Sequence, residues 1–172
     1  MFIVIAITAQ KGFVMSSNPP NAIHRLVAEN EIRRLLAIYV HNLDDGKIGA
    51  NADLLSDAKF QVVDTVVTGR DEIAKFFRTN VQHHEDGTPR TSHSLSNAII
   101  DIETATTAKA VTYFTVHQEL PGLPLQPIVT GRYEDEFKIL DGNWRFASRR
   151  VVPRLFGELK DHVATPADDK AA

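Results

Sequence analysis

Apolar residues recur at spacings of three and four between Ile32 and Leu43, in the segment IRRLLAIYVHNLDDG. Such spacing places them on one stripe of an α-helix. The stripe leads into Asp44, Asp45 and Gly46, and both Asp and Gly are common where helices stop. Carboxylates are nevertheless unfavourable at a helix C-terminus, because the helix dipole places partial negative charge there. Considered alone, the two acids are explained by a solvated turn.

The remaining pattern predicts two further helices and a run of strands. The helix that contains Ile32 is expected to begin near Ala22, with Asn21 as its N-cap, and to continue to about Leu43. Shorter helices are expected at residues 50–55 and 72–79. Runs of β-branched and alternating residues predict strands at 59–67, 91–102, 107–120, 127–140 and 144–152.

This order of elements predicts an α+β fold. Helices that are segregated from a run of antiparallel strands pack together on one face of the sheet. A curved sheet, mixed or antiparallel, that is closed on one side by helices makes a cone, and a cone leaves a pocket. The strands near 111–116 and 132–137 carry two patterned faces, of which only one can face that pocket. We expect the other face to pack on a neighbouring subunit, giving a homodimer or a homotrimer.

Composition narrows the possible partners and compartments. The chain has 172 residues, 43% of them hydrophobic and 24% charged, which is typical of one globular domain with a sizeable core. The formal net charge is -3 and no basic stripe is present, so nucleic acid is not an expected partner. The absence of cysteine excludes disulfides and thiolate metal sites, and it permits a cytoplasmic location, which we expect.

The two ends of the chain differ in composition from the part between them. The apolar run Met1–Ala6 is too short to span a bilayer and lacks the basic residues of an export signal, so no membrane association is expected. Met15 precedes a polar run and has the features of a start site, so residues 1–17 are interpreted as a tail or an over-extended gene start. We expect one domain at residues 18–156 and a C-terminal tail at residues 157–172.

Alternation within the strand expected at 91–102 singles out one histidine. It places His93, Leu95, Asn97 and Ile99 on one face, so His93 shares a face with apolar residues and is expected to be buried. A buried histidine is commonly a structural residue whose ring bonds to a backbone carbonyl. The alternative is a functional pairing of His93 with a carboxylate elsewhere in the chain.

Two other polar clusters can be explained without a metal site or a catalytic site. The run His83-His84-Glu85 lies in a polar loop and lacks a further ligand at metal-binding spacing, so neither a metal nor a cofactor is expected. Charges alternate from Arg132 to Glu136 along a strand. Cross-strand ion pairs or an oligomer face account for that alternation better than catalysis does.

Four segments make the chain resemble the SnoaL-like branch of the nuclear transport factor 2-like superfamily. They are YVHNLDDG at 39–46, TSHSLSN at 91–97, GRYEDEF at 131–137 and DGNWRFASRR at 141–150. Their order and spacing carry the resemblance, which covers about residues 28–154. It implies a cystatin-like α+β barrel. Within the superfamily, the segments look most like those of the scytalone dehydratases and the hexachlorocyclohexane dehydrochlorinases.

Both of these enzyme groups imply an Asp–His dyad inside the cone. In the dehydrochlorinase pattern an Ile begins the helix and the catalytic Asp follows twelve residues later, as Ile32 and Asp44 do here. The catalytic His opens the strand after the long loop, where His93 stands. A neutral imidazole suits a base near neutral pH, because its reference pKa is about 6.5. A carboxylate that accepts from one ring nitrogen selects the tautomer and stabilises the imidazolium formed on proton abstraction.

The same resemblance implies a third catalytic residue. Its arginine ends the motif G-x-W-basic-F-two residues-Arg, which lands on Arg149, and this side chain could stabilise a departing anion or an enolate oxygen. Alternation instead groups Arg150 with the bulky residues Trp144 and Phe146, so the two arginines compete for the inward position. The expected substrate contacts are Tyr39, Val62, Phe76 and Leu95.

We interpret the chain as a cofactor-independent enzyme that abstracts a proton from a hydrophobic cyclic or aromatic substrate. The expected reaction is an elimination, of the dehydratase or dehydrohalogenase type, or an isomerisation. Ketosteroid isomerases share the fold, but they are implied to carry a base Asp where this chain has Val62, which counts against their route. The alternative is a non-catalytic module of the same fold that binds a small molecule or serves assembly. An open pocket with Asp44 and His93 in contact distinguishes the enzyme from a module whose core fills the cone.

Overall fold

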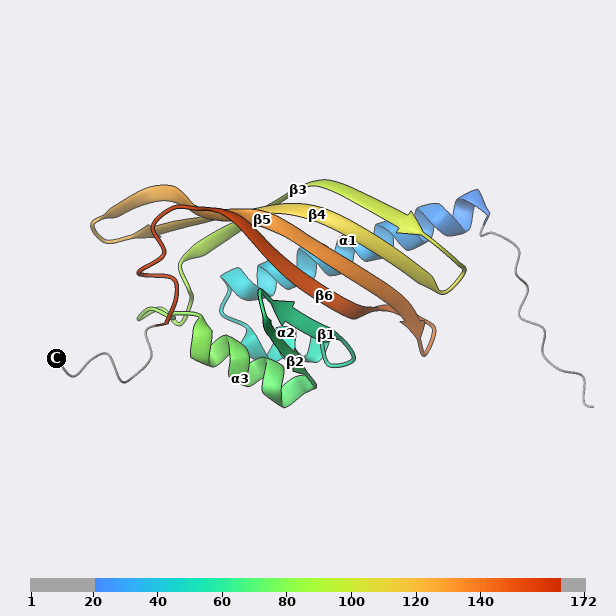
Figure 1. Cartoon of the computed structure of the whole chain (residues 1–172), viewed down its shortest axis with the longest axis horizontal. Helices are drawn as coiled ribbons and strands as arrows, with labels where there is room; N and C mark the ends of the chain where they lie inside the picture. Colours follow the sequence, from blue (N-terminus) through green and yellow to red (C-terminus); the bar gives the residue numbers. More distant parts are fainter. Residues whose placement is uncertain (1–20, 165–172) are drawn as a thin grey trace, which may run out of the picture.

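The computed structural model describes residues 21–164, which form three helices and one six-stranded sheet (Figure 1). The expected N-terminal tail at residues 1–17, and residues 165–172 of the C-terminal tail expected at residues 157–172, lie outside the described residues. Helix α1 runs along one face of the sheet, and α2, α3 and the β1–β2 pair lie beside its C-terminal half (Figure 1). The elements in chain order are α1 (Ala22–Asp44), α2 (Ile48–Leu54), β1 (Lys59–Val62), β2 (Thr65–Thr68), α3 (Arg70–Asn80), β3 (Thr91–Ile102), β4 (Thr107–Leu120), β5 (Leu123–Leu140) and β6 (Asn143–Phe156).

Four long antiparallel strands form most of the sheet, as the alternating pattern predicts. The strand order is β2-β1-β6-β5-β4-β3, in which β3 to β6 form a meander and β1 runs parallel to β6. The expected α+β fold, with helices on one face of a mixed sheet, is therefore confirmed. Within residues 21–164, none of the three helices combines the length and the apolar character that a membrane crossing requires.

The strand expected at residues 59–67 is instead a hairpin. Strands β1 and β2 pair antiparallel, and Val63 and Asp64 form the turn between them. Val63 has a φ of +52°, a left-handed conformation that β-branched residues rarely adopt. The turn lacks the Gly and Asn residues by which hairpins are recognised in a sequence, so the nearly continuous β-branched run concealed it.

Helix α1 delivers Asp44 to one end of the sheet. Asn21 caps the start of the helix by accepting a hydrogen bond from the backbone N–H of His24 at 2.8 Å. The buried stripe matches the one expected from the spacing of apolar residues, and its burial against the sheet holds the helix in place. Its members are Ala28, Ile32, Leu36, Tyr39 and Val40.

The end of α1 is set by Gly46, which takes a φ of +68°. A Cβ atom at this position would collide with the backbone carbonyl oxygen of Gly87, in the loop that leads to β3. The bare backbone of Gly46 therefore lets the helix end and that loop approach each other closely.

We expect Gly46→Ala to destabilise the protein by more than the cost of about 1–2 kcal/mol for a left-handed alanine, because the carbonyl of Gly87 must also move. Gly49→Ala is the matched control, since Gly49 lies in α2 and a Cβ atom added there would meet no other atom within 4 Å. Urea unfolding of the two variants provides the comparison. Equal free energies of unfolding would contradict the assigned contact between Gly46 and Gly87.

A β-bulge in β3 resets the alternation that the sequence implies. The register against β4 shifts between Ser96 and Ile99, and Asn97 takes a φ of +50°. His93 lies before the bulge and faces inward, whereas 65% of the surface of Ile99 is exposed. The expectation that His93, Asn97 and Ile99 share one face is therefore wrong, because it assumed an unbroken strand.

A second bulge in β6 decides between the two arginines. Phe137 pairs with Phe146 and Glu136 pairs with Ser148, which leaves Ala147 as the additional residue. Beyond it, Arg149 is fully buried and Arg150 faces solvent. The grouping of Arg150 with the inward aromatic residues is wrong, because the bulge shifts the phase of the strand by one residue.

Candidate active site

The carboxylate of Asp44 and the imidazole of His93 meet where the C-terminus of α1 reaches the start of β3. His93 Nδ1 lies 2.6 Å from Asp44 Oδ1. The same carboxylate accepts hydrogen bonds from the His93 backbone N–H and from the Thr91 hydroxyl, both at 2.8 Å. These donors offset the unfavourable end of the helix dipole, which explains why a carboxylate is tolerated there.

The protonation state of Asp44 follows from these contacts. Burial raises the pKa of Asp44, but the hydrogen bonds from His93 and Thr91 outweigh it and hold the pKa below its usual value. The carboxylate is therefore ionised at neutral pH and can only accept hydrogen bonds, so Nδ1 of His93 carries the proton in their contact. In the neutral ring, Nε2 is left with a free lone pair, which is what a general base requires.

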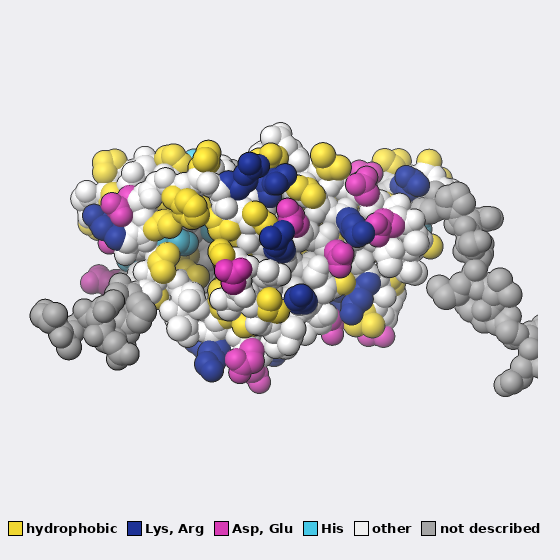
Figure 2. Space-filling view, viewed as in Figure 1, with side chains coloured by type: hydrophobic (Ala, Val, Ile, Leu, Met, Phe, Trp, Pro, Cys, Tyr) yellow, Lys and Arg dark blue, Asp and Glu magenta, His cyan; other side chains and the backbone are white. Residues whose placement is uncertain are grey.

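A cavity of about 420 Å³ opens beside His93, between the inner face of the sheet, the end of α1 and α3. Three hydrophobic residues of its lining, Val63, Phe156 and Val163, remain largely exposed and form its rim. Figure 2 shows hydrophobic side chains and a histidine surface gathered around a hollow near the C-terminal end of the described chain. A molecule that enters this cavity exchanges water for mainly apolar contacts.

Aromatic side chains form much of the cavity wall. Phe114 stacks on Tyr133 with ring centroids 4.5 Å apart, and Tyr39 meets Tyr133 edge-on at 5.7 Å. Burial raises the pKa of Tyr39 to about 12 and the pKa of Tyr133 well above its usual value. Both hydroxyls are therefore neutral at physiological pH, and the wall presents flat apolar surface with uncharged polar groups.

Arg149 points inward but is bound to a buried partner. Its Nε and Nη2 donate to the two carboxylate oxygens of Asp135 at 2.8 and 2.7 Å. Its guanidinium also lies over the rings of Tyr39 and Tyr133, at 4.0 and 4.3 Å from their centroids. Burial lowers the pKa of Arg149, but the charge of Asp135 raises it overall, so the guanidinium stays charged. Both tyrosine rings line the cavity and Arg149 does not, which places Arg149 behind the cavity wall.

Three of the four expected substrate contacts, Tyr39, Val62 and Phe76, line the cavity. Leu95 does not line it, although it lies two residues beyond His93 on the same face of β3. That step along the strand carries Leu95 beneath α1, into a separate groove that it shares with Leu36 and Thr112. The expected contact between Leu95 and a substrate in this cavity is therefore not supported by its position.

Residues 157–164, here called the C-terminal strap, fold back onto the domain that was expected to end at residue 156. Val163 forms a β-bridge with Val81, and the backbone N–H of Gln82 donates to His162 O at 2.9 Å. Three side chains of the strap line the cavity, namely Leu159, His162 and Val163. Sequence patterns do not reveal them, because the strap is held mainly through backbone groups, which leave no pattern in the side chains.

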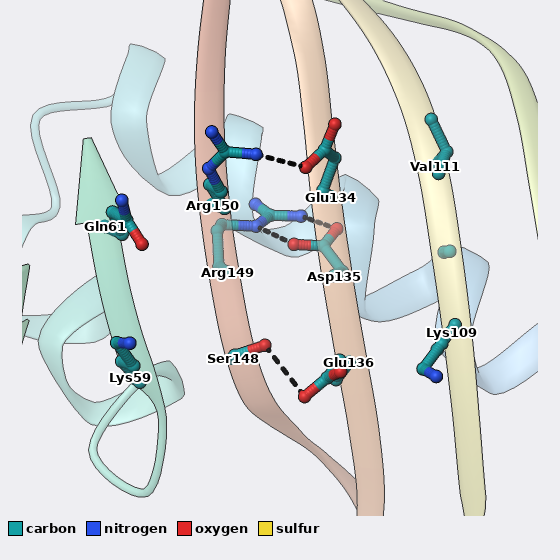
Figure 3. Close-up of a pocket in the computed structure, with 11 residues that line it drawn as sticks. Lys59, Gln61, Lys109, Val111, Glu134, Asp135, Glu136, Ser148, Arg149 and Arg150 are labelled. Carbon is teal, nitrogen blue, oxygen red and sulfur yellow. Dashed lines mark hydrogen bonds and ion pairs between the residues drawn. The ribbon is translucent and has the colours of Figure 1, made fainter. Parts of the chain in front are cut away.

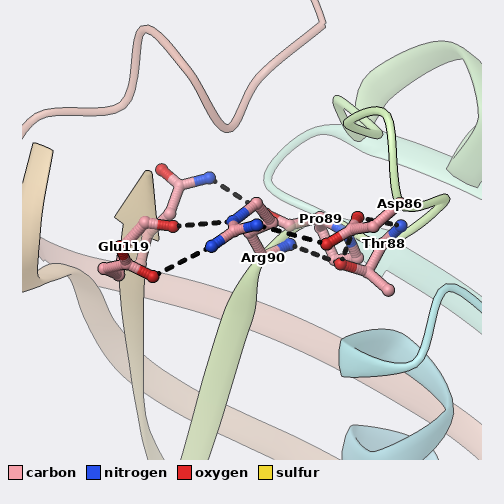
Figure 4. Close-up of polar contacts among 6 residues, drawn as sticks. Asp86, Thr88, Pro89, Arg90 and Glu119 are labelled. Atoms are coloured by element: carbon pink, nitrogen blue, oxygen red, sulfur yellow. Dashed lines mark hydrogen bonds and ion pairs between the residues drawn. The ribbon is translucent and has the colours of Figure 1, made fainter. Parts of the chain in front are cut away.

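The loop that precedes β3 is tied to the end of β4 (Figure 4). Arg90 donates to the carboxylate of Glu119 at 3.0 Å and to its backbone carbonyl at 3.2 Å, and it also reaches Asp86 at 3.4 Å. Gln118 is buried and its Nε2 donates both to Pro89 O at 3.0 Å and to Asp161 O at 3.2 Å. One amide group thus fastens the loop and the C-terminal strap to the same strand.

The outer face of the sheet carries a groove of about 430 Å³ that is lined mostly by charged and polar side chains. Figure 3 shows Arg150 directed at Glu134 and Ser148 directed at Glu136, with contacts of 2.8 and 3.3 Å. The contact of Arg150 with Glu134 is a cross-strand ion pair of the kind expected from the alternating charges, whereas Glu136 accepts from a serine and Asp135 on the same strand faces inward. Among residues 21–164, no three His, Asp or Glu side chains form a group suited to a metal ion.

Comparison with known proteins identifies a family and a set of related folds. Residues 24–150 match the family described as the SnoaL-like domain. A protein from Novosphingobium aromaticivorans, provisionally assigned as a scytalone dehydratase, has a TM-score of 0.66 at 24% identity, and the match covers 86% of this chain and 97% of that one. A type 2 hexachlorocyclohexane dehydrochlorinase has a TM-score of 0.65 at 22% identity, covering 86% and 99%.

A third similar structure is the β subunit of a provisionally assigned aromatic-ring-hydroxylating dioxygenase, also from Novosphingobium aromaticivorans. Its TM-score is 0.63 at 19% identity, and the match covers 82% of this chain and 99% of that one. No curated protein matches the sequence. Likenesses at such low identity show a common cystatin-like fold and do not distinguish an enzyme from an accessory subunit.

Proposed function

Because the chain belongs to the SnoaL-like domain family, we propose that it is a small, cofactor-independent lyase or isomerase that acts on a hydrophobic cyclic substrate. The observation that carries the proposal is the 2.6 Å contact between His93 Nδ1 and Asp44 Oδ1 at the wall of an apolar cavity. A purely structural histidine is usually satisfied by a backbone carbonyl. Here the ring is instead held by an ionised carboxylate and faces open space.

In the proposed reaction, the lone pair of His93 Nε2 takes a proton from a carbon of the substrate. The electron pair of the broken C–H bond forms a new double bond, and in an elimination the hydroxide or halide on the adjacent carbon departs with its own bonding pair. Asp44 stabilises the imidazolium formed in this step. When the leaving group is hydroxide, His93 returns the proton and water is released, so the enzyme is restored without a cofactor. In an isomerisation the proton returns to a different carbon.

The volume and lining of the cavity indicate a class of substrate and not a single compound. Its volume of about 420 Å³ lies in the range of sites for small organic molecules. The stacked rings of Phe114 and Tyr133 suit a flat ring system, and the exposed apolar rim suits a molecule that partitions out of water. These features favour cyclic or aromatic ketones and alcohols over sugars, phosphates or peptides.

A binding-only function is the second candidate, because the same cavity could hold a ligand without reacting with it. The two candidate functions differ in whether they require the free Nε2 of His93. A binder needs the shape of the cavity, whereas an enzyme also needs the lone pair of this nitrogen and the charge of Asp44 behind it.

A screen of polycyclic and aromatic ketones and alcohols tests the proposal. Compounds that raise the melting temperature are expected to include at least one that the protein converts, as followed by mass spectrometry for loss of water or halide and by NMR for double-bond movement. Ligands that bind tightly but remain unchanged in every case would favour the binding-only function.

We also expect the outer face of the sheet to pack on a second copy of the chain. Tyr113 lies on this face with 38% of its surface exposed, and the guanidinium of Arg132 lies 5.9 Å from the centroid of its ring. Sedimentation equilibrium at micromolar concentration should report a homodimer or homotrimer, and Tyr113→Glu should shift the protein toward monomer. A monomeric wild-type protein at that concentration would contradict the expectation.

A further inference from the structure

His162 is a second histidine of the cavity that the proposed reaction does not yet use. It lies in the C-terminal strap, where its carbonyl accepts from Gln82 N–H at 2.9 Å and its N–H donates to Leu159 O at 2.9 Å. The neighbouring Asp161 O is held by Gln118 at 3.2 Å. The backbone on both sides of the side chain is therefore anchored, and the ring lines the same cavity as His93.

Neither ring nitrogen of His162 has a hydrogen-bond partner among residues 21–164, and one of the two is buried. Its Nδ1 is buried and makes no hydrogen bond among the described residues, whereas Nε2 is not occluded. Buried N–H groups without a partner are rarer than unpaired acceptors. The arrangement consequently favours the tautomer in which Nδ1 is bare and Nε2 carries the proton toward the cavity.

The charge state of His162 agrees with a hydrogen-bonding role. Its pKa is lowered to about 4, chiefly by burial and also by the neighbouring His93 and His84, against an opposing contribution from Asp44. The ring is thus neutral at physiological pH and keeps one N–H donor. A neutral imidazole that donates to a substrate carbonyl is an established way to polarise it.

The two histidines therefore present opposite groups to the cavity. His93 offers a lone pair at Nε2, because Asp44 holds the proton on Nδ1. His162 offers an N–H at Nε2. Arg149, expected from the sequence to stabilise an oxyanion, lies behind Tyr39 and Tyr133 and is paired with Asp135. In this cavity, His162 and not Arg149 is placed to donate a hydrogen bond to an oxyanion.

We propose that His162 Nε2–H donates a hydrogen bond to the carbonyl oxygen of the substrate while His93 removes a proton from the carbon adjacent to the carbonyl carbon. The substrate class is then a cyclic ketone with a hydrogen on the adjacent carbon. As the C–H bond breaks, the proton goes to His93 and its electron pair forms an enolate, whose oxygen is stabilised by His162. The enolate collapses when it expels a leaving group from the next carbon or regains the proton at another position. This reaction rests on the proposed function, whereas the hydrogen bond from His162 to the carbonyl oxygen of a bound ketone does not.

Matched ligands test the recognition directly. Isothermal titration of 1-tetralone and of tetralin, which lacks the carbonyl oxygen, separates the hydrogen bond from the apolar contacts. The wild-type protein should bind the ketone about 3- to 10-fold more tightly than the hydrocarbon, as one net hydrogen bond allows. His162→Leu should abolish this preference while it leaves the affinity for tetralin unchanged or improved.

Two further variants keep the test specific. His162→Gln retains an N–H donor on a side chain of similar reach and should keep part of the preference. His84→Leu is the matched control, because His84 also has a buried nitrogen without a partner but does not line the cavity, and it should keep the full preference. A ketone preference that is absent in the wild type, that survives in His162→Leu, or that His84→Leu also removes would overturn the inference.

The same variants separate this inference from the proposed function. If the ketone preference depends on His162 but no ketone is converted, the recognition stands and the proposed catalysis fails. If turnover depends on His93 and is unchanged in His162→Leu, the catalysis stands and the role of His162 is refuted.

Discussion

Replacing His93 with alanine is expected to lower turnover by about 10²–10⁴-fold, the usual contribution of a positioned general base. The melting temperature should change little by comparison, because the ring lines a cavity and fills no closed core position. The measurement is turnover of a substrate found in the ligand screen, together with thermal unfolding. Wild-type turnover in a folded His93→Ala protein would rule out the assignment.

Asp44→Asn is expected to lower turnover to a similar extent, because an amide does not stabilise the imidazolium as a carboxylate does. Asp45→Asn is the matched control on the adjacent residue, whose exposed carboxylate pairs with Lys47 at 2.8 Å. This control should keep wild-type turnover. Equal losses in the two variants would mean that the effect comes from the helix end in general and not from the contact with His93.

Asp44 should also leave a signature in the pH dependence of stability. Its pKa is lowered in the folded protein, so it binds protons less readily there than in the unfolded chain. Its stabilising contribution is therefore complete above the unfolded pKa of about 3.9 and is lost as the pH falls below that value toward the folded pKa. Urea unfolding between neutral and acidic pH should show this loss in the wild type and a shallower one in Asp44→Asn.

Arg149→Met should destabilise the protein by about 3–5 kcal/mol, because it leaves the carboxylate of Asp135 buried without its partner. The matched control is Arg150→Met on the same strand, which breaks the exposed pair with Glu134 and should cost at most about 1 kcal/mol. The double variant with Asp135→Leu should recover much of the loss, since both charges are then removed together.

The same experiment tests the catalytic role that the resemblance implies for Arg149. A side chain that supports the cavity wall from behind affects turnover mainly through folding. Arg149→Met should therefore lower turnover per folded molecule by no more than about tenfold, which is much less than the loss of about 10²–10³-fold expected for a missing oxyanion donor. A variant that stays as stable as the wild type but loses its turnover would show that Arg149 reaches the substrate, and that the pair with Asp135 opens during the reaction.

Much of the fold was predictable because local patterns and tertiary structure agree. The helical stripe at Ile32 to Val40 matches the buried positions of α1, and the alternation in β4 and in the part of β3 before its bulge matches those of the sheet. The contact between Asp44 and His93, which are 49 positions apart, was expected from the family resemblance. The local patterns agree with it, because Asp44 ends a clearly patterned helix and His93 lies near the start of a clearly patterned strand.

The sequence by itself determined the α+β architecture and the order of elements apart from the β1–β2 hairpin, and the family resemblance that it carries pointed to the two residues whose contact defines the candidate site. Tertiary structure alone decided the rest, because those outcomes depend on phase and on backbone contacts. The bulge at Ala147 turned Arg149 inward and gave it Asp135 as a partner, and period-two reasoning cannot detect a one-residue shift. Backbone hydrogen bonds and the amide of Gln118 hold the C-terminal strap against the cavity. Because these contacts leave no pattern in the side chains, the sequence does not predict that His162 shares an apolar cavity with His93.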